Sequence, residues 1–203
     1  MSLIAKKKKG FTIPAGVYQG ILIGIHDLGT QYSEKYHKED LKVAFVFELP
    51  DAETSMDTPV TLCKIYTNSL HEKATLRKHI EALVGTSLSE TQIDEGVDLS
   101  KLLGANVQLQ VVQTESDGRT RMNIQNVMAL APKTKRLKSF SEHTFYEIDS
   151  FRDIPASTPE WIRLQIVKSK EWQTPVEEEE PTFDGEKELP FEEQVEETVP
   201  EPI

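Results

Sequence analysis

Apolar and polar residues alternate most clearly over residues 41–50 of this chain. One face of that segment carries Leu41, Val43, Phe45, Phe47 and Leu49. A period of two is the signature of a half-buried β-strand, and Pro50 marks its end. The pattern therefore predicts a strand whose two phenylalanines pack in a hydrophobic core.

Similar patterns predict four further strands, at residues 16–26, 60–67, 106–113 and 119–130. In the first, Val17, Ile21, Ile23 and Ile25 share one side, and Gly20 and Gly24 interrupt the segment. Glycine inside a strand often marks a bend, so we expect this strand to curve. The polar residues 27–40 that follow predict a loop, and loops of that length usually carry function or are disordered.

The period changes to that of a helix after the third strand. Ser69 and Glu72 have the spacing of a capping box, which satisfies free N–H groups where a helix starts. Apolar residues recur at helical spacing as far as Leu83, and Gly85 then predicts the end of the helix. Residues 87–103 predict a polar linker with one or two short helical turns.

The predicted order of three strands, a helix and two strands is that of the OB-fold, a small, partly open barrel. We therefore expect a mainly β domain with helices, a five-stranded OB-like barrel over residues 11–138; another small α+β domain remains the alternative. Residues 139–174 predict an extension with a short strand at 143–148. Its last helix, at residues 159–172, has Pro159 at its first position and should pack on the barrel.

The charge of the chain is concentrated at its end. The formal net charge is −11, and residues 175–203 contain twelve acidic residues and one lysine, so the remaining residues are neutral overall. This composition predicts a disordered acidic tail. At the other end, residues 1–10 include Lys6 to Lys9 and predict a disordered basic arm, with contact to phosphates as the less favoured alternative.

The sequence gives little support for any functional class other than a binding protein. Cys63 is the only cysteine, which excludes an internal disulfide. The sequence contains no stretch of 18 apolar residues, so no membrane-spanning helix is predicted. No enzyme motif is present, and the histidines lack metal-ligand spacing; His71 and His79 are expected at the surface. We therefore expect a cytoplasmic protein that is not an enzyme and needs no metal or cofactor.

Basic and aromatic residues, in contrast, gather in the places where an OB-fold binds its ligands: strands two and three, the first loop and the loop between strands four and five. Proteins that bind single-stranded nucleic acid combine a positive groove with rings on which bases stack. Each residue alone could be a solvated surface group, but together they predict such a site. They are Tyr32, Lys35, Tyr36, Lys38, Lys42, Lys64, Tyr66, Arg119, Arg121, Lys133, Lys135 and Arg136.

The segments IPAGVYQGILIGIHDLGTQ, KIYTNSLHEKATLRKHIEAL, LLGANVQLQVV and GRTRMNIQNVMALAP, followed by PEWI, resemble proteins of bacteriophage and prophage replication modules that are described as single-stranded DNA-binding proteins. The resemblance spans residues 13–162. It implies a role in phage DNA replication or recombination inside the bacterial host cell. Single-stranded DNA is then the expected partner, and oligomers are compatible with it.

A second resemblance concerns the tail. Bacterial single-stranded DNA-binding proteins end in an acidic tip that finishes in Pro-Phe, and this chain has a similar segment: Asp184, Glu186, Glu188, Leu189, Pro190 and Phe191. The resemblance implies docking on phage or host replication and recombination proteins, and competition with DNA for the protein's own groove. Here residues 192–203 follow the phenylalanine, so a pocket that needs a terminal carboxylate would not be satisfied. A solubilising tail with a chance apolar triplet is the alternative.

Two other functions remain open at this point. One is a non-enzymatic protein-interaction factor of the same replication module, whose barrel binds a protein and whose tail mimics DNA. The other is a DNA mimic that inhibits nucleases. A mimic should be acidic on its folded surface, and the neutral body with its basic segment is unfavourable to that function.

Overall fold

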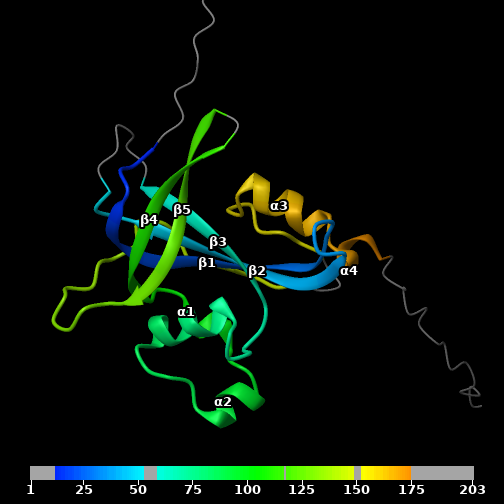
Figure 1. Ribbon diagram of the computed structural model, residues 1–203, viewed down its shortest axis with the longest axis horizontal. Helices are drawn as coiled ribbons and strands as arrows, with labels where there is room; N and C mark the ends of the chain where they lie inside the picture. Colours follow the sequence, from blue (N-terminus) through cyan, green and yellow to red (C-terminus); the bar gives the residue numbers. More distant parts are fainter. Residues whose placement is uncertain (1–11, 53–58, 117, 149–151, 175–203) are drawn as a thin grey trace, which may run out of the picture.

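The computed structural model of the chain describes residues 12–52, 59–116, 118–148 and 152–174. It is mainly β, as the sequence predicts, with a twisted sheet and a few helices (Figure 1). The sheet order is β3-β2-β1-β4-β5, and these neighbours are antiparallel. The strands are β1 (Gly16–Ser33), β2 (Lys38–Leu49), β3 (Val60–Thr67), β4 (Asn106–Ser116) and β5 (Arg119–Ala129). A sixth strand, β6 (Thr144–Tyr146), pairs in parallel with β1.

The predicted loop at residues 27–40 is wrong in most of its length. β1 continues to Ser33 and β2 begins at Lys38, so a four-residue turn at 34–37 joins them. The prediction of one apolar side on β1 is also wrong. The pairing with β2 shifts register between Leu22 and Gly24, and that irregularity places Ile23 in a different hydrophobic cluster from Ile25.

Hydrophobic clusters cover both faces of β1 and β2. The larger cluster contains Phe45 and Phe47, both fully buried, which confirms their predicted place in the core. The smaller cluster includes Ile23, Ala44 and Val46 on the opposite face. Strands that are buried on both faces read as nearly continuous apolar segments, which explains GILIGI and VAFVF.

Helix α1 (Thr75–Val84) packs on the larger cluster through Leu76, Ile80 and Leu83. The predicted capping box is wrong, because the helix begins six residues after Ser69 and its N-cap, Ala74, offers no side-chain bond. Gly85 ends the helix with φ of 83°, as predicted. A capping box occurs instead at Ser89 and Gln92, on α2 (Glu90–Asp94), which a short 3₁₀ helix (Leu99–Leu102) follows.

The C-terminal extension covers the opposite face of the sheet. Helix α3 (Glu160–Val167) buries Ile162 and Ile166 in the smaller cluster. The single helix expected over residues 159–172 is divided, because Ser169 begins a second helix, α4 (Lys170–Gln173), by accepting a hydrogen bond from the Trp172 N–H. In Figure 1, α1 and α3 therefore lie on opposite sides of the strands.

Over the described residues, the sheet does not close into a continuous hydrogen-bonded barrel. β3 and β5 are its two edges. They are connected by a side chain rather than by a backbone ladder: Lys64 on β3 donates to the backbone oxygens of Ile124 (2.5 Å) and Gln125 (3.3 Å) on β5. We call this junction the β3–β5 seam.

Candidate nucleic-acid interface

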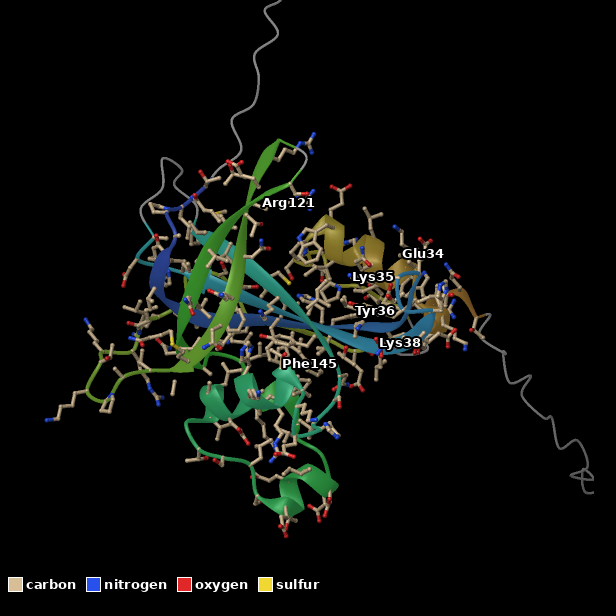
Figure 2. All side chains as sticks on the ribbon, viewed as in Figure 1. Glu34, Lys35, Tyr36, Lys38, Arg121 and Phe145 are labelled. Atoms are coloured by element: carbon tan, nitrogen blue, oxygen red, sulfur yellow. The ribbon has the colours of Figure 1, made fainter. Side chains whose placement is uncertain are left out.

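The end of the β1–β2 hairpin presents two aromatic rings to solvent. Tyr32 and Tyr36 are 60% and 64% exposed, and the Lys35 ammonium lies 5.3 Å from the centre of the Tyr36 ring. Both tyrosines line a hollow of about 450 Å³ that also contains Lys38 and Lys42. Sticks in Figure 2 show Lys35, Tyr36 and Lys38 together at this end of the molecule. The structure thus brings five of the predicted residues together.

One carboxylate lies in this hollow and organises its lysines. Asp40 accepts hydrogen bonds from Lys38 (3.0 Å) and Lys42 (3.1 Å), and these bonds hold the pKa of its carboxyl below the usual range. Lys42 also donates to the Thr67 hydroxyl at 2.7 Å. The single carboxylate of Asp40 balances one of the two lysine charges, so the group of Lys38, Asp40 and Lys42 keeps a net positive charge.

A second hollow, of about 490 Å³, continues from the first because both include Lys42 and Thr67. Its lining adds Lys64 and Lys73 and contains no carboxylate. Ile65, 46% exposed, supplies an apolar patch. The two hollows form one basic surface along the ends of β2 and β3, which we call the hairpin surface. Lys73 was not among the predicted residues, because the sequence placed it in the first turn of a helix and gave no reason to expect it beside β3; in the structure it precedes α1.

Tyr66 and Lys64 are corrections to the predicted site. Both were expected to point outward, but Tyr66 is only 4% exposed, and its hydroxyl lies 2.8 Å from the Nδ1 atom of His79. His79 is itself buried rather than at the surface, and its Nε2 atom lies 3.2 Å from the Asn126 side-chain oxygen. The Lys64 ammonium is engaged by β5 at the seam, and burial lowers its pKa. Tyr66 therefore cannot stack with a base in this conformation.

The remaining predicted residues lie elsewhere. Arg119 and Arg121 are exposed on β5, and Figure 2 shows Arg121 well separated from Tyr36. Lys133, Lys135 and Arg136 are exposed in the connection between β5 and β6. In Figure 1 that connection lies at the opposite end of the sheet from the β1–β2 turn. The structure consequently divides the predicted basic residues among three places.

The C-terminal helix α4 holds the hairpin in position. Glu171 accepts hydrogen bonds from the Thr30 backbone N–H (2.7 Å) and hydroxyl (2.5 Å). Lys170 pairs with Glu39 at 2.9 Å. These contacts tie the twisted end of β1 and β2 to the extension, so the aromatic residues sit on a supported element rather than on a free loop.

The six predicted partner-binding residues, Asp184 to Phe191, lie outside the described residues. The last described residue, Thr174, lines a small hollow together with Tyr32. Thr174, the residue that precedes the acidic segment in the sequence, therefore lies beside the hairpin surface.

No helix within residues 12–52, 59–116, 118–148 and 152–174 is long and apolar enough to cross a membrane. Over the same described parts of the chain, no three metal-ligating side chains of the His, Cys, Asp or Glu type lie close enough to hold an ion. Comparison with models of protein families finds no match, and comparison with curated proteins finds none either.

Proposed function

We propose that this chain is a single-stranded DNA-binding protein of the OB type that binds without strong sequence preference and is not an enzyme. The observation that carries the proposal is the hairpin surface, where exposed Tyr32 and Tyr36 adjoin Lys35, Lys38, Lys42 and Lys73. Rings that stack with any base and ammonium groups that follow the phosphates are the two requirements of such binding.

The strand order supports the same proposal. An OB-fold orders its strands as β3-β2-β1-β4-β5, brings β3 and β5 together, and places a helix between β3 and β4. This sheet has that order, its seam joins β3 to β5, and α1 lies between β3 and β4. The hairpin surface includes the first loop and the ends of strands two and three, where the OB-fold binds oligonucleotides.

The biological setting is proposed from the sequence resemblance. We infer a role in phage DNA replication or recombination in the cytoplasm of a bacterial host, with the acidic residues 175–203 regulating binding or recruiting replication proteins. The hairpin surface is compatible with this setting but does not specify it.

Fluorescence anisotropy with labelled oligo-dT, duplex DNA and RNA across a salt series tests the proposal. If about 4–6 phosphates are contacted, the logarithm of affinity should fall against the logarithm of salt with a slope of about −3 to −4. Duplex DNA should bind more weakly, because its bases are not free to stack. Equal affinity for duplex and single strand would contradict the stacking surface.

Substitutions locate the surface. Tyr36→Ala should reduce oligo-dT affinity by about 1–3 kcal/mol with little change in salt slope, whereas Lys35→Gln should lower the slope by up to about 0.7. Trp161→Ala, on exposed α3, and Lys101→Gln, at a lysine whose side chain is 80% exposed, are matched controls without expected effect. Wild-type affinity of folded Tyr32→Ala and Tyr36→Ala variants would reject this face of the molecule.

One observation favours the alternative of a protein-interaction factor. Helix α3 exposes Trp161, Leu164 and Val167 by 44%, 55% and 43%. Exposed apolar residues gathered on one helix are typical of protein contacts. If no oligonucleotide binds in the anisotropy series, this helix becomes the favoured functional surface.

A further inference from the structure

Phe140 is the most exposed large hydrophobic residue in the described part of the chain, at 76%. A single exposed apolar side chain is common and needs no explanation by itself. Here, however, the backbone beneath the ring is fixed by a buried charge. Glu48 on β2 is fully buried, and its two carboxylate oxygens accept hydrogen bonds from the backbone N–H groups of Phe140 (2.7 Å) and Ser141 (2.9 Å).

Burying a carboxylate is unfavourable unless hydrogen bonds compensate for the lost water. Glu48 obtains two such bonds, and both come from the segment that carries the exposed ring. The arrangement thus fixes the place from which Phe140 projects into solvent. Because the backbone is held in this way, only the side-chain rotamer of Phe140 has to be ordered when another flat group packs against the ring.

The rest of the segment is fixed as well. Asn106 at the start of β4 accepts from the Leu137 backbone N–H at 2.8 Å and donates to the Leu137 oxygen at 3.3 Å. Gln19 on β1 donates to the Lys135 oxygen at 2.9 Å. Lys133 adopts φ of 67°, a left-handed conformation that is unfavourable for a lysine, inside a turn closed by Thr134 N–H and Ala131 O. Strained residues of this kind are concentrated at functional sites.

Positive charge precedes the ring in sequence, and the first charged residue after it is Glu142. Residues 131–141 contain no acid. Their basic residues are all exposed: Lys133, Lys135, Arg136 and Lys138. An exposed ring on a fixed backbone, preceded in sequence by four exposed cations, has the chemistry that recognises a base together with its phosphates.

We propose that Phe140, with these four basic residues, is a second contact for single-stranded nucleic acid at the opposite end of the sheet from the hairpin surface. The inference rests on the proposed function and extends it. Glu48 pairs with Ile21 on β1, eleven residues before Tyr32. At about 3.3 Å per residue, the two contacts are separated by roughly 36 Å along the strand. A short oligonucleotide therefore reaches one contact, and a longer one reaches both.

Oligo-dT of two lengths tests this inference with the full chain: about 6 and about 16 nucleotides, within the range that one OB-type surface covers. Phe140→Ala should leave the affinity for the short oligonucleotide within twofold. It should weaken the affinity for the long one by about 5- to 140-fold, the loss of one stacked base. Phe140→Tyr keeps a ring and should restore the long-oligonucleotide affinity. Arg136→Gln should lower the salt slope by up to about 0.7, for the long oligonucleotide only.

The outcomes separate this inference from the proposed function. If Tyr36→Ala weakens both lengths and Phe140→Ala weakens neither, the hairpin surface binds DNA and the second contact is wrong. If Phe140→Ala reduces the affinity for both lengths equally, Phe140 is not a separate contact at the far end of the sheet, and the inference is also overturned. If Phe140→Ala leaves DNA affinity unchanged and alters self-association in sedimentation velocity, the ring is a protein contact. If neither length binds the wild type, the proposed function itself fails.

Discussion

His79 bridges Tyr66 on β3 and Asn126 on β5 separately from the Lys64 seam, and the pH dependence of stability tests this bridge. Burial lowers the pKa of its imidazole from 6.5 to about 4. One tautomer satisfies the network, in which Tyr66 donates to Nδ1 and Nε2–H donates to Asn126. Because the pKa is lower in the folded state, the unfolded chain binds a proton more readily below pH 6.5. The contribution of neutral His79 is therefore complete above 6.5 and is lost as the pH falls toward about 4.

The full pKa difference corresponds to about 3 kcal/mol at most. Solvent in the hollow beside Tyr66 screens part of the charge, so we expect an effect of about 1–2 kcal/mol between about pH 7.5 and pH 5. His79→Gln retains one donor and one acceptor but does not titrate. Urea unfolding followed by circular dichroism should show that the stability loss of the wild type over this range is larger than that of the variant by this amount.

Exposed His71 is the matched control, and His71→Gln should keep the wild-type pH dependence. His26 is also buried, with its pKa lowered to about 4, so some dependence should persist in His79→Gln. If the free energy of unfolding of His79→Gln changes with pH as much as that of the wild type, the buried network is not what couples β3, α1 and β5.

Lys64→Met keeps the apolar stem of the side chain but removes its hydrogen bonds to β5. The free energy of unfolding, measured by urea titration, should therefore fall by about 1–3 kcal/mol. A lower oligo-dT salt slope with unchanged stability would instead make Lys64 a phosphate contact. Deleting residues 175–203 should tighten oligo-dT binding, most at low salt, because a tethered polyanion competes at an effective concentration of order millimolar. Unchanged low-salt anisotropy would reject that competition, whereas Phe191→Ala should preserve it and weaken only pull-down of replication partners.

The sequence predicted the strands better than their faces. Alternation in β2 placed Phe45 and Phe47 in the core, because Lys42 and Glu48 lie between obvious apolar residues. In β3 the same period of two links Val60, Leu62, Lys64 and Tyr66, so the pattern already contained the inward direction of the last two. Residue type alone favours an outward lysine and tyrosine, whereas the period of two favours the inward direction that the structure has. A lysine on the buried side is compatible with the fold only because the edge of β5, more than fifty residues later, supplies carbonyl oxygens.

Phe140 was missed for a different reason. Its segment has no periodicity, and the features that fix it are Glu48, Asn106 and Gln19, all distant in sequence. Exposure and rigidity of a loop depend on such tertiary contacts, which local patterns do not encode. Lys133 and its neighbours were predicted as binding residues from their charge alone, and charge does not indicate where in the fold a residue lies.

The C-terminal extension limits where a nucleic acid can bind. In an OB-fold the outer face of strands two and three is the usual platform. Here α3 and its neighbours bury Ala44 and Val46 on that face of β2. A strand of DNA cannot reach these residues unless the extension is displaced, which would expose the apolar surface of Ile162 and Ile166. The proposed binding therefore uses surfaces that the extension leaves uncovered, among them the hairpin surface at one end and the Phe140 segment at the other. For this reason the difference in affinity between short and long oligonucleotides, rather than the affinity for one length, tests whether both surfaces contact the same strand.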